Sequence, residues 1–154
     1  MGSESAAELD GTDWRLLAAL QEDARLSHAE LGRRVHLSPP AVAGRLRRLE
    51  ACGVVRGYRA ELDLPRLGLV VLAFVRVRSH PARRRDFDDA IQGMVEVLEC
   101  HHVTGEDCYV VKVATRSMSH LEEVVAELGR HGETTTSIVF SSPVANRVLT
   151  MRSG

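Results

Sequence analysis

The sequence predicts an α+β protein in which a helical N-terminal domain precedes a mixed domain of the order βαββαβ. Apolar residues recur at helical spacing in three short segments before residue 60. The segment 61–68 is rich in turn-forming residues, and beyond it the pattern becomes strand-like. A strand, a helix and a strand then follow one another twice, in blocks of nearly equal length. We therefore expect residues 1–60 and 69–154 to form two domains, joined by a linker at 61–68.

The first two helices are indicated by acidic and hydroxyl capping residues. Asp10, followed by Asp13, opens an amphipathic segment that is expected to run to about Asp23. Ser27 has Glu30 three residues after it, which is the capping-box pattern, so a second short helix is expected to begin there. The two helices are therefore expected to be separated by only a few residues of sequence.

The third helix is predicted after a break of only three residues, 36–38. Ser38 is the expected N-cap, and the helix is expected to run to about Cys52, with Gly53 as its terminating residue. The following segment, 54–60, predicts an extended wing or a short hairpin. Two helices separated by so short a turn form a helix-turn-helix, whose final helix enters the major groove of DNA.

The third helix has one apolar and one small-residue face. Val42, Leu46 and Leu49 share the apolar stripe, and small residues on the opposite face let the backbone approach base edges. Arg47 is the expected base contact, and Arg45, nearer the apolar stripe, is expected to be partly structural. The complete set of expected DNA-binding residues is Arg34, Ser38, Pro40, Ala43, Gly44, Arg45, Arg47, Arg48 and Arg56.

The second half of the sequence alternates between strand and helix patterns. Strands are expected at 69–78, 95–103, 108–115 and 134–142, and helices at 83–94 and 119–130. This order predicts a ferredoxin-like domain, in which one antiparallel sheet carries two helices on one face. Val70, Leu72 and Phe74 are apolar on the face opposite to Ala73 and Val75. We expect that uncovered face to pack against a second subunit, which makes the protein a dimer.

The composition indicates a soluble globular protein, with 44% apolar and 27% charged residues. The longest uncharged apolar run, 67–75, is far shorter than the roughly 18–20 residues that a membrane helix needs. The three cysteines, Cys52, Cys100 and Cys108, are scattered and form neither a disulfide framework nor a paired zinc module. We therefore expect a cytoplasmic, nucleoid-associated protein with reduced thiols.

An enzyme hypothesis starts from a cluster of potential ligands and nucleophiles, namely His101, His102, Glu106, Asp107 and Cys108. Two adjacent histidines on one strand point to opposite faces, and no histidine pair has the helical spacing of a metal site. The run 134–137 of hydroxyl residues has no glycine-rich phosphate loop before it. The sequence therefore favours a binding protein with no catalytic residue, metal or cofactor.

A set of short motifs extends along nearly the full length of the chain, namely Leu9-Asp10 and Asp13, Glu30-Leu31-Gly32, Leu37-Ser38, Val42, Arg45-Leu46, Arg48-Leu49-Glu50, Gly53-Val54-Val55, Tyr58-Arg59-Ala60 and Val103-Thr104-Gly105. In these motifs the chain resembles the Lrp/AsnC, or feast-or-famine, family of transcriptional regulators. The resemblance implies a C-terminal domain that dimerises through its sheet and often builds octamers from four dimers. It also implies that amino acids or related metabolites bind in clefts between dimers.

The resemblance places the effector at the glycine loop and at a threonine run that is expected to face it. The residues so implied are Gly105, Glu106, Asp107, Tyr109, Thr134, Thr135 and Thr136. A glycine turn offers backbone N–H groups to a carboxylate, an acidic side chain can pair with an ammonium group, and threonine hydroxyls can do either.

Two positions depart from the pattern of the family. The family has an aromatic residue and then Asp after the glycine loop, whereas this chain has Asp107 followed by Cys108. The shift of one residue is expected to turn the acidic side chain to the other face of the strand. At the turn of the helix-turn-helix a glycine is usual, and this chain has His36, which adopts a positive φ at modest cost.

A second hypothesis is a stand-alone small-molecule sensor whose helical half binds a protein or RNA. The sequence favours double-stranded DNA, because residues 24–59 hold eight arginines against two glutamates, a net charge of +6 with histidine neutral. Steep loss of duplex binding with added salt distinguishes the hypotheses. Replacing Arg47 and Arg48 by Ala is expected to abolish specific binding without unfolding the protein.

Overall fold

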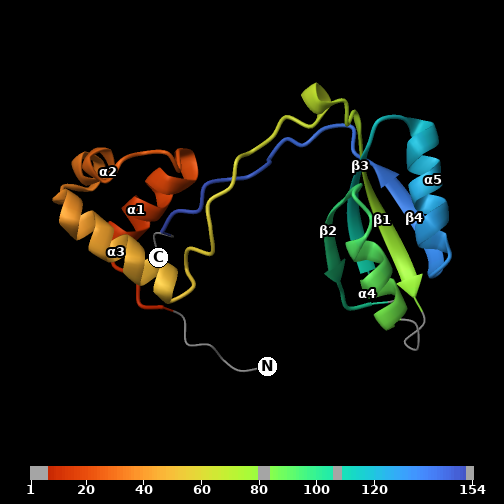
Figure 1. Ribbon diagram of the computed structural model, residues 1–154, viewed down its shortest axis with the longest axis horizontal. Helices are drawn as coiled ribbons and strands as arrows, with labels where there is room; N and C mark the ends of the chain where they lie inside the picture. Colours follow the sequence, from red (N-terminus) through yellow and green to blue (C-terminus); the bar gives the residue numbers. More distant parts are fainter. Residues whose placement is uncertain (1–6, 80–83, 106–108, 152–154) are drawn as a thin grey trace. The chain divides into compact units, whose positions relative to one another are not determined.

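The computed structural model describes residues 7–79, 84–105 and 109–151. The chain divides into two compact units, a helical unit of residues 1–61 and 144–154 and a sheet unit of residues 62–143 (Figure 1). Within the described ranges no helix is long and apolar enough to cross a membrane.

The helical unit contains α1 (Gly11–Glu22), α2 (His28–Val35) and α3 (Pro39–Ala51). Their apolar stripes meet in one core, in which Leu16, Val42 and Leu49 are completely buried. Both predicted capping boxes are confirmed: Asp10 and Asp13 cap α1 reciprocally, and so do Ser27 and Glu30 at α2. Ser38 is the N-cap residue of α3, although its side chain makes no capping hydrogen bond.

The turn between α2 and α3 is tight and depends on two residues. His36 adopts the left-handed conformation with φ 59°, as its position in the turn predicted. Gly32 accepts a backbone hydrogen bond from the N–H of Leu37 at 2.9 Å, and a Cβ at Gly32 would lie only 2.3 Å from the Leu37 oxygen. The close helix–turn contact therefore requires glycine at this position.

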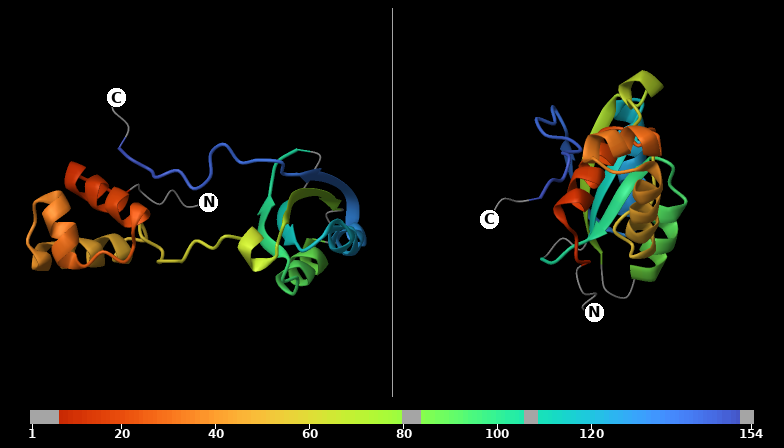
Figure 2. Two further views of the ribbon diagram at one scale, coloured as in Figure 1. Left: turned by 90° about the horizontal axis from the view of Figure 1, so that it is seen from above. Right: turned by 90° about the vertical axis from the view of Figure 1, so that its left-hand side faces the viewer.

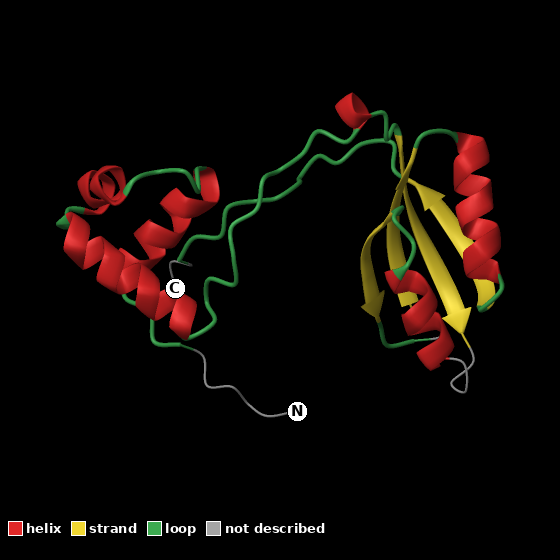
Figure 3. Cartoon of the chain, in the orientation of Figure 1, coloured by secondary structure: helices red, strands yellow, loops and turns green. Residues whose placement is uncertain are grey.

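The sheet unit confirms the predicted order of strands and helices. The strands are β1 (Val71–Ser79), β2 (Val97–His102), β3 (Tyr109–Thr115) and β4 (Gly132–Ile138), and the helices are α4 (Arg84–Gln92) and α5 (Met118–Gly129). A short 3-10 turn, Pro65–Leu67, precedes β1. The four strands form one antiparallel sheet in the order β2-β3-β1-β4 (Figure 3). This is the ferredoxin-like topology.

Both helices of the sheet unit cover the same face of the sheet (Figure 2). Ala73, Val75 and Val77 of β1 are completely buried and pack with Phe87 of α4 and Leu128 of α5. The opposite face of β1 carries alternate residues of the same strand, such as Phe74, which is 38% exposed. Strand alternation therefore produces one covered face and one outer face, as the sequence pattern predicted.

Two expectations about the segments outside the core differ from the structure. Of the two alternatives predicted for 54–60, the short hairpin is wrong, because no strand forms there. The final residues, 144–154, were expected to belong to the sheet domain but group with the helical unit. Neither segment has the apolar periodicity that gives a local signal, so their positions depend on contacts with distant residues.

Candidate nucleic-acid interface

The exposed face of α3 is built from small residues around one arginine. Val42, Leu46 and Leu49 turn inward, which leaves Pro40, Ala43, Gly44 and Arg47 on the outer side of the helix, with Ala43 partly covered. A Cβ added at Gly44 would meet nothing within 4 Å. Packing within the unit therefore does not require glycine at position 44, and the small residue leaves the helix backbone open to a ligand.

Arg47 is exposed and is not engaged by other side chains. Within the described ranges its guanidinium makes no hydrogen bond or ion pair, and the same holds for Arg56. Arg34 forms an exposed ion pair with Glu22, at 3.1 Å between nitrogen and oxygen. Exposed pairs of this kind contribute little, about 0–1 kcal/mol, so Arg34 can exchange Glu22 for another anion.

Arg45 and Arg48 of α3 turn toward α1 instead. Arg45 donates to Asp10 at 2.7 Å and to Asp13 at 2.8 Å, and Arg48 donates to the other carboxylate oxygen of Asp13. The Asp13 side chain is 1% exposed, whereas that of Arg48 is 48% exposed. We call these four residues the Asp13 cluster; it fixes α3 against the first turn of α1.

The Asp13 cluster was missed by sequence reasoning, and it adds a stability cost to one expected substitution. Replacing Arg48 was expected to leave the fold intact, but the change removes a donor from a buried carboxylate, which costs free energy. The available signal was the spacing of Arg45 and Arg48, three residues apart on one side of a helix, together with two acids at the start of α1. Arg45 was expected to be partly structural, and its two ion pairs support that expectation.

Electrostatics in the Asp13 cluster favour the charged forms. Burial alone raises the pKa of Asp13, but hydrogen bonds from Arg48, Arg45 and the backbone N–H of Asp10 outweigh it, so the pKa lies below its usual value. The pKa of Asp10 is lowered by the backbone N–H of Asp13 and by Arg45. The same contacts raise the pKa of Arg45, the bond to Asp10 contributing most. Asp10, Asp13 and Arg45 are therefore ionised at neutral pH.

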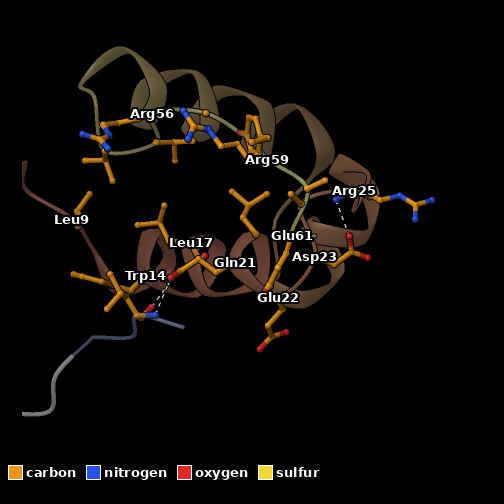
Figure 4. Close-up of a pocket in the computed structure, with 18 residues that line it drawn as sticks. Leu9, Trp14, Leu17, Gln21, Glu22, Asp23, Arg25, Arg56, Arg59 and Glu61 are labelled. Carbon is orange, nitrogen blue, oxygen red and sulfur yellow. Dashed lines mark hydrogen bonds between the residues drawn. The ribbon is translucent and has the colours of Figure 1, made fainter. Parts of the chain in front are cut away.

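A groove of about 820 Å³ lies on another side of the helical unit, between α1 and the segment 54–61 (Figure 4). Trp14 and Leu17 supply apolar surface from α1, and Arg56 and Arg59 come from the facing segment. Leu149 from the C-terminal segment also lines the groove. The groove is therefore formed within one unit, from three separate parts of the sequence.

Those of the expected effector residues that the structure describes do not converge within the chain. Gly105 has a φ of 111°, which favours glycine, while Glu106 and Asp107 lie outside the described residues. Tyr109 is 4% exposed, and its ring packs against Phe87 with 4.4 Å between centroids. The expectation that Tyr109 contacts an effector directly is therefore not supported, because the ring belongs to the core.

The threonine run also differs from the expectation that it faces the glycine loop. Val77 of β1 pairs with both Tyr109 and Thr134, so β1 separates the threonines from β3. Thr134 and Thr136 lie on the face that the helices cover, and Thr135 lies on the outer face, because successive strand residues alternate. The three hydroxyls therefore do not form one surface in a single chain.

The histidines of the enzyme hypothesis lie on different faces of β2. His101 contacts Glu99 at 3.2 Å, whereas the ring of His102 lies 5.1 Å from that of Tyr109. No cluster of three metal-binding side chains occurs in the part of the chain that the structure describes. Glu106, Asp107 and Cys108 lie outside that part.

The two units match two parts of one protein family. Residues 9–50 match the AsnC-type helix-turn-helix domain, and residues 71–149 match the Lrp/AsnC ligand binding domain. The HTH-type transcriptional regulator LrpC of Bacillus subtilis is 34% identical over 134 residues, covering 87% of this chain and 93% of LrpC. The leucine-responsive regulatory protein of Escherichia coli is 37% identical over 123 residues, covering 78% of this chain and 75% of that protein.

Solved structures give the same result. The structure of B. subtilis LrpC has a TM-score of 0.85 at 33% identity and covers 88% of this chain and 97% of its own. A transcriptional regulator from Neisseria meningitidis in complex with L-Met has a TM-score of 0.85 at 35% identity, covering 92% and 96% of the two chains. The feast or famine regulatory protein from Mycobacterium tuberculosis, complexed with L-methionine, has a TM-score of 0.86 at 31% identity, covering 94% and 100%. With both domains matched in order, the chain belongs to the Lrp/AsnC family of helix-turn-helix transcriptional regulators.

Proposed function

We propose that this protein is a sequence-specific regulator that binds double-stranded DNA through α3 and responds to an amino acid held by its sheet unit. The observation that carries the proposal is the exposed face of α3, where unpaired Arg47 lies among small residues while the inner face is held by the core and the Asp13 cluster. Such a face fits the major groove. The protein is then a binding protein, and it acts on DNA in the cytoplasm.

The DNA contacts divide by chemistry. Arg47 contacts a guanine edge from the centre of the exposed face, flanked by Pro40, Ala43 and Gly44. Arg34, Arg56 and the hydroxyl of Ser38 contact phosphates and set the register on the duplex. Arg45 and Arg48 act mainly by holding α3 on Asp13, and the exposed part of Arg48 adds positive charge near the backbone.

The effector is an amino acid, by analogy with the two regulators whose structures contain L-methionine. Its site includes the loop that begins at Gly105, together with Glu106 and Asp107. Because β1 lies between β3 and the threonines of β4 in one chain, we expect Thr134, Thr135 and Thr136 to take part only if another subunit brings them to this site. A dimer through the outer sheet face, and an octamer of four dimers, supplies such interfaces.

Regulation follows from differential binding. An effector shifts an assembly only if it binds one of its states more tightly, and the shift then changes DNA affinity by the same coupling free energy. The proposed response is therefore a change in DNA affinity when the amino acid is added, without any chemical change in either ligand.

The test is binding of the full chain to fragments upstream of its own gene, at two salt concentrations, with and without each of the twenty amino acids. Affinity that falls steeply with salt, and that one amino acid changes, supports the proposal. Binding that no amino acid alters rejects the proposed effector class. Absence of duplex binding at low salt rejects the proposed function and favours a sensor that acts through protein contacts.

The contact assignment is tested with Arg47→Ala on the same fragments. One good bidentate base contact is worth about 1–3 kcal/mol, so the specific affinity is expected to fall roughly tenfold to a hundredfold. The matched control is Arg130→Ala, which removes an exposed arginine from the end of α5 in the sheet unit. Equal operator affinity of both variants would reject Arg47 as the base contact.

A further inference from the structure

The C-terminal segment makes a second connection between the two parts of the fold. The chain leaves the helical unit at Glu61, forms the whole sheet unit, and returns to the helical unit at Val144. Only ten residues, 139–148, separate the end of β4 at Ile138 from Leu149. An extended chain of that length spans at most about 35 Å. The helical unit is therefore held to the sheet unit at two points of the sequence.

Two hydrogen bonds between Gln21 and Leu149 hold the returning segment on α1. The side-chain amide of Gln21 accepts from the backbone N–H of Leu149 at 2.9 Å and donates to its carbonyl oxygen at 3.0 Å (Figure 4). The same amide nitrogen also lies 3.0 Å from the carbonyl oxygen of Leu17, which fixes the Gln21 rotamer. An amide that pairs with both backbone groups of one residue imitates the pairing of adjacent strands, so it accepts the segment in one orientation.

Two further contacts hold the same segment. Asn146 donates to the carboxylate of Glu61 at 2.6 Å, which joins the point of return to the point of departure. Leu149 lines the groove beside Trp14 and Leu17. The segment is therefore held by hydrogen bonds at Asn146 and Leu149, and Leu149 also contributes apolar surface to the groove.

The docking residue lies on the helix that holds the recognition helix. Gln21 is in the last turn of α1, and the Asp13 cluster ties the first turn of α1 to Arg45 and Arg48 of α3. A single helix of twelve residues joins the two contacts. The contact with the C-terminal segment and the contact with the recognition helix therefore lie at the two ends of one helix.

We propose that residues 144–151 are a second tether, which docks on α1 through Gln21 and limits the orientations that the recognition helix can take relative to the sheet unit. This inference rests on the proposed function for its consequence but not for the docking itself. A single linker permits one unit to swivel, whereas two attachments restrict that rotation. Movement of β4 in the sheet unit then reorients α3, whereas a single flexible linker would leave the orientation of α3 independent of β4.

Docking is tested by fluorescence of the full-length protein and its variants, since Trp14 is the only tryptophan of the chain. Gln21→Glu keeps the shape and helix propensity of the side chain but replaces the donor to the Leu149 carbonyl by a carboxylate oxygen. A second variant ends the chain after Pro143. Both are expected to shift Trp14 emission to longer wavelength because the groove opens, while Gln92→Glu, the same change at an exposed position of α4, leaves the emission unchanged.

The consequence for DNA is tested with two half-sites, placed either in helical phase or shifted by half a turn, roughly five base pairs. The affinity for the in-phase fragment, divided by that for the shifted fragment, is expected to be well above one for the natural chain. This ratio is expected to fall toward one in Gln21→Glu and in the shortened chain. A ratio that does not change overturns the tether as an orienting device. Unchanged Trp14 emission in both variants overturns the docking. If the natural chain binds no DNA, the proposed function fails, and the emission measurement still decides the docking.

Discussion

At the scale of single residues, Asp13 has two tasks that share one carboxylate. It closes the capping box of α1 by accepting from the N–H of Asp10, and it accepts from Arg45 and Arg48 of α3. All three donors point at a group that is almost fully buried. A buried carboxylate is tolerated only when it is fully hydrogen-bonded, so the contacts explain why an acid lies in the core of the helical unit.

Asp13→Asn is expected to lower the free energy of unfolding by about 1–3 kcal/mol. The carboxylate accepts from three donors with two oxygens, whereas an amide has only one oxygen that can accept. The guanidiniums of Arg45 and Arg48 keep partial access to water, which limits the loss. Denaturant unfolding of the full chain measures the change. Asp63→Asn, which breaks an exposed pair with Arg66, is the control and is expected to have an effect near zero. Equal stability of the two variants would contradict the role given to Asp13.

The same contacts predict a dependence of stability on acid. The pKa values of Asp13 and Asp10 in the folded protein lie below the usual value of 3.8. Their stabilisation is therefore fully present above pH 3.8 and is lost as the pH falls through the lowered pKa values, where the folded state must take up protons. Unfolding curves of the natural chain should lose stability below that pH, and Asp13→Asn should lose less. Parallel pH profiles for both would show that Asp13 does not contribute.

At the scale of elements, the local signals in the sequence were enough to place the helices and strands but not the contacts between them. The capping boxes at Asp10 and Ser27, the three-residue turn and the positive φ of His36 each depend on residues within one turn of chain. The ion pairs of Arg45 join residues more than thirty positions apart, and the Gln21–Leu149 pair joins residues 128 apart. No periodicity reports such distances, so these contacts required the folded chain.

Strand alternation explains why one expectation about the two faces of the sheet was correct and another was wrong. Alternation along β1 correctly separated Ala73 and Val75 from Phe74, because the strand has period two. The threonine run was expected to act as a unit, yet the same alternation sends Thr135 to the face opposite Thr134. The identity of the strand that lies between β3 and β4 depends on sheet order, which the linear pattern does not contain.

Two glycines of the helix-turn-helix predict opposite effects of one substitution. Gly44→Ala is expected to raise the free energy of unfolding by roughly 0.5–1 kcal/mol, because alanine favours the helix and the added Cβ meets nothing. Gly32→Ala is expected to lower it by at least about 1–3 kcal/mol, because the Cβ would collide with the backbone oxygen of Leu37. Thermal unfolding of both variants gives the comparison. A stabilised Gly32→Ala protein would show that the turn can relax, and it would reject the close contact as a determinant of the fold.

At the scale of the whole molecule, each unit has its own part in the proposed function. The helical unit supplies a rigid recognition helix whose inner side is fully used by the core and the Asp13 cluster. The sheet unit has one face covered by α4 and α5 and one face that no other described element of the same unit covers. In the proposed function the effector acts on an assembly of sheet units that has two states, so the outer face is the feature on which the proposed regulation depends.

The outer face predicts a dimer that a single charge can break. Phe74 lies on that face opposite Lys112 of β3, with the Glu99 carboxylate bonded to Lys112 at 2.8 Å. Phe74→Asp is expected to leave the monomer folded, because the side chain is outside the core, and to weaken the dimer about tenfold or more by replacing an apolar side chain with a charge in the interface. Sedimentation equilibrium at several concentrations measures the change. The matched control is Val95→Asp, at an exposed position in the turn between α4 and β2. If the natural chain and both variants have the same mass at every concentration, the outer face is not the subunit interface, and the proposed effector cleft between subunits loses its basis.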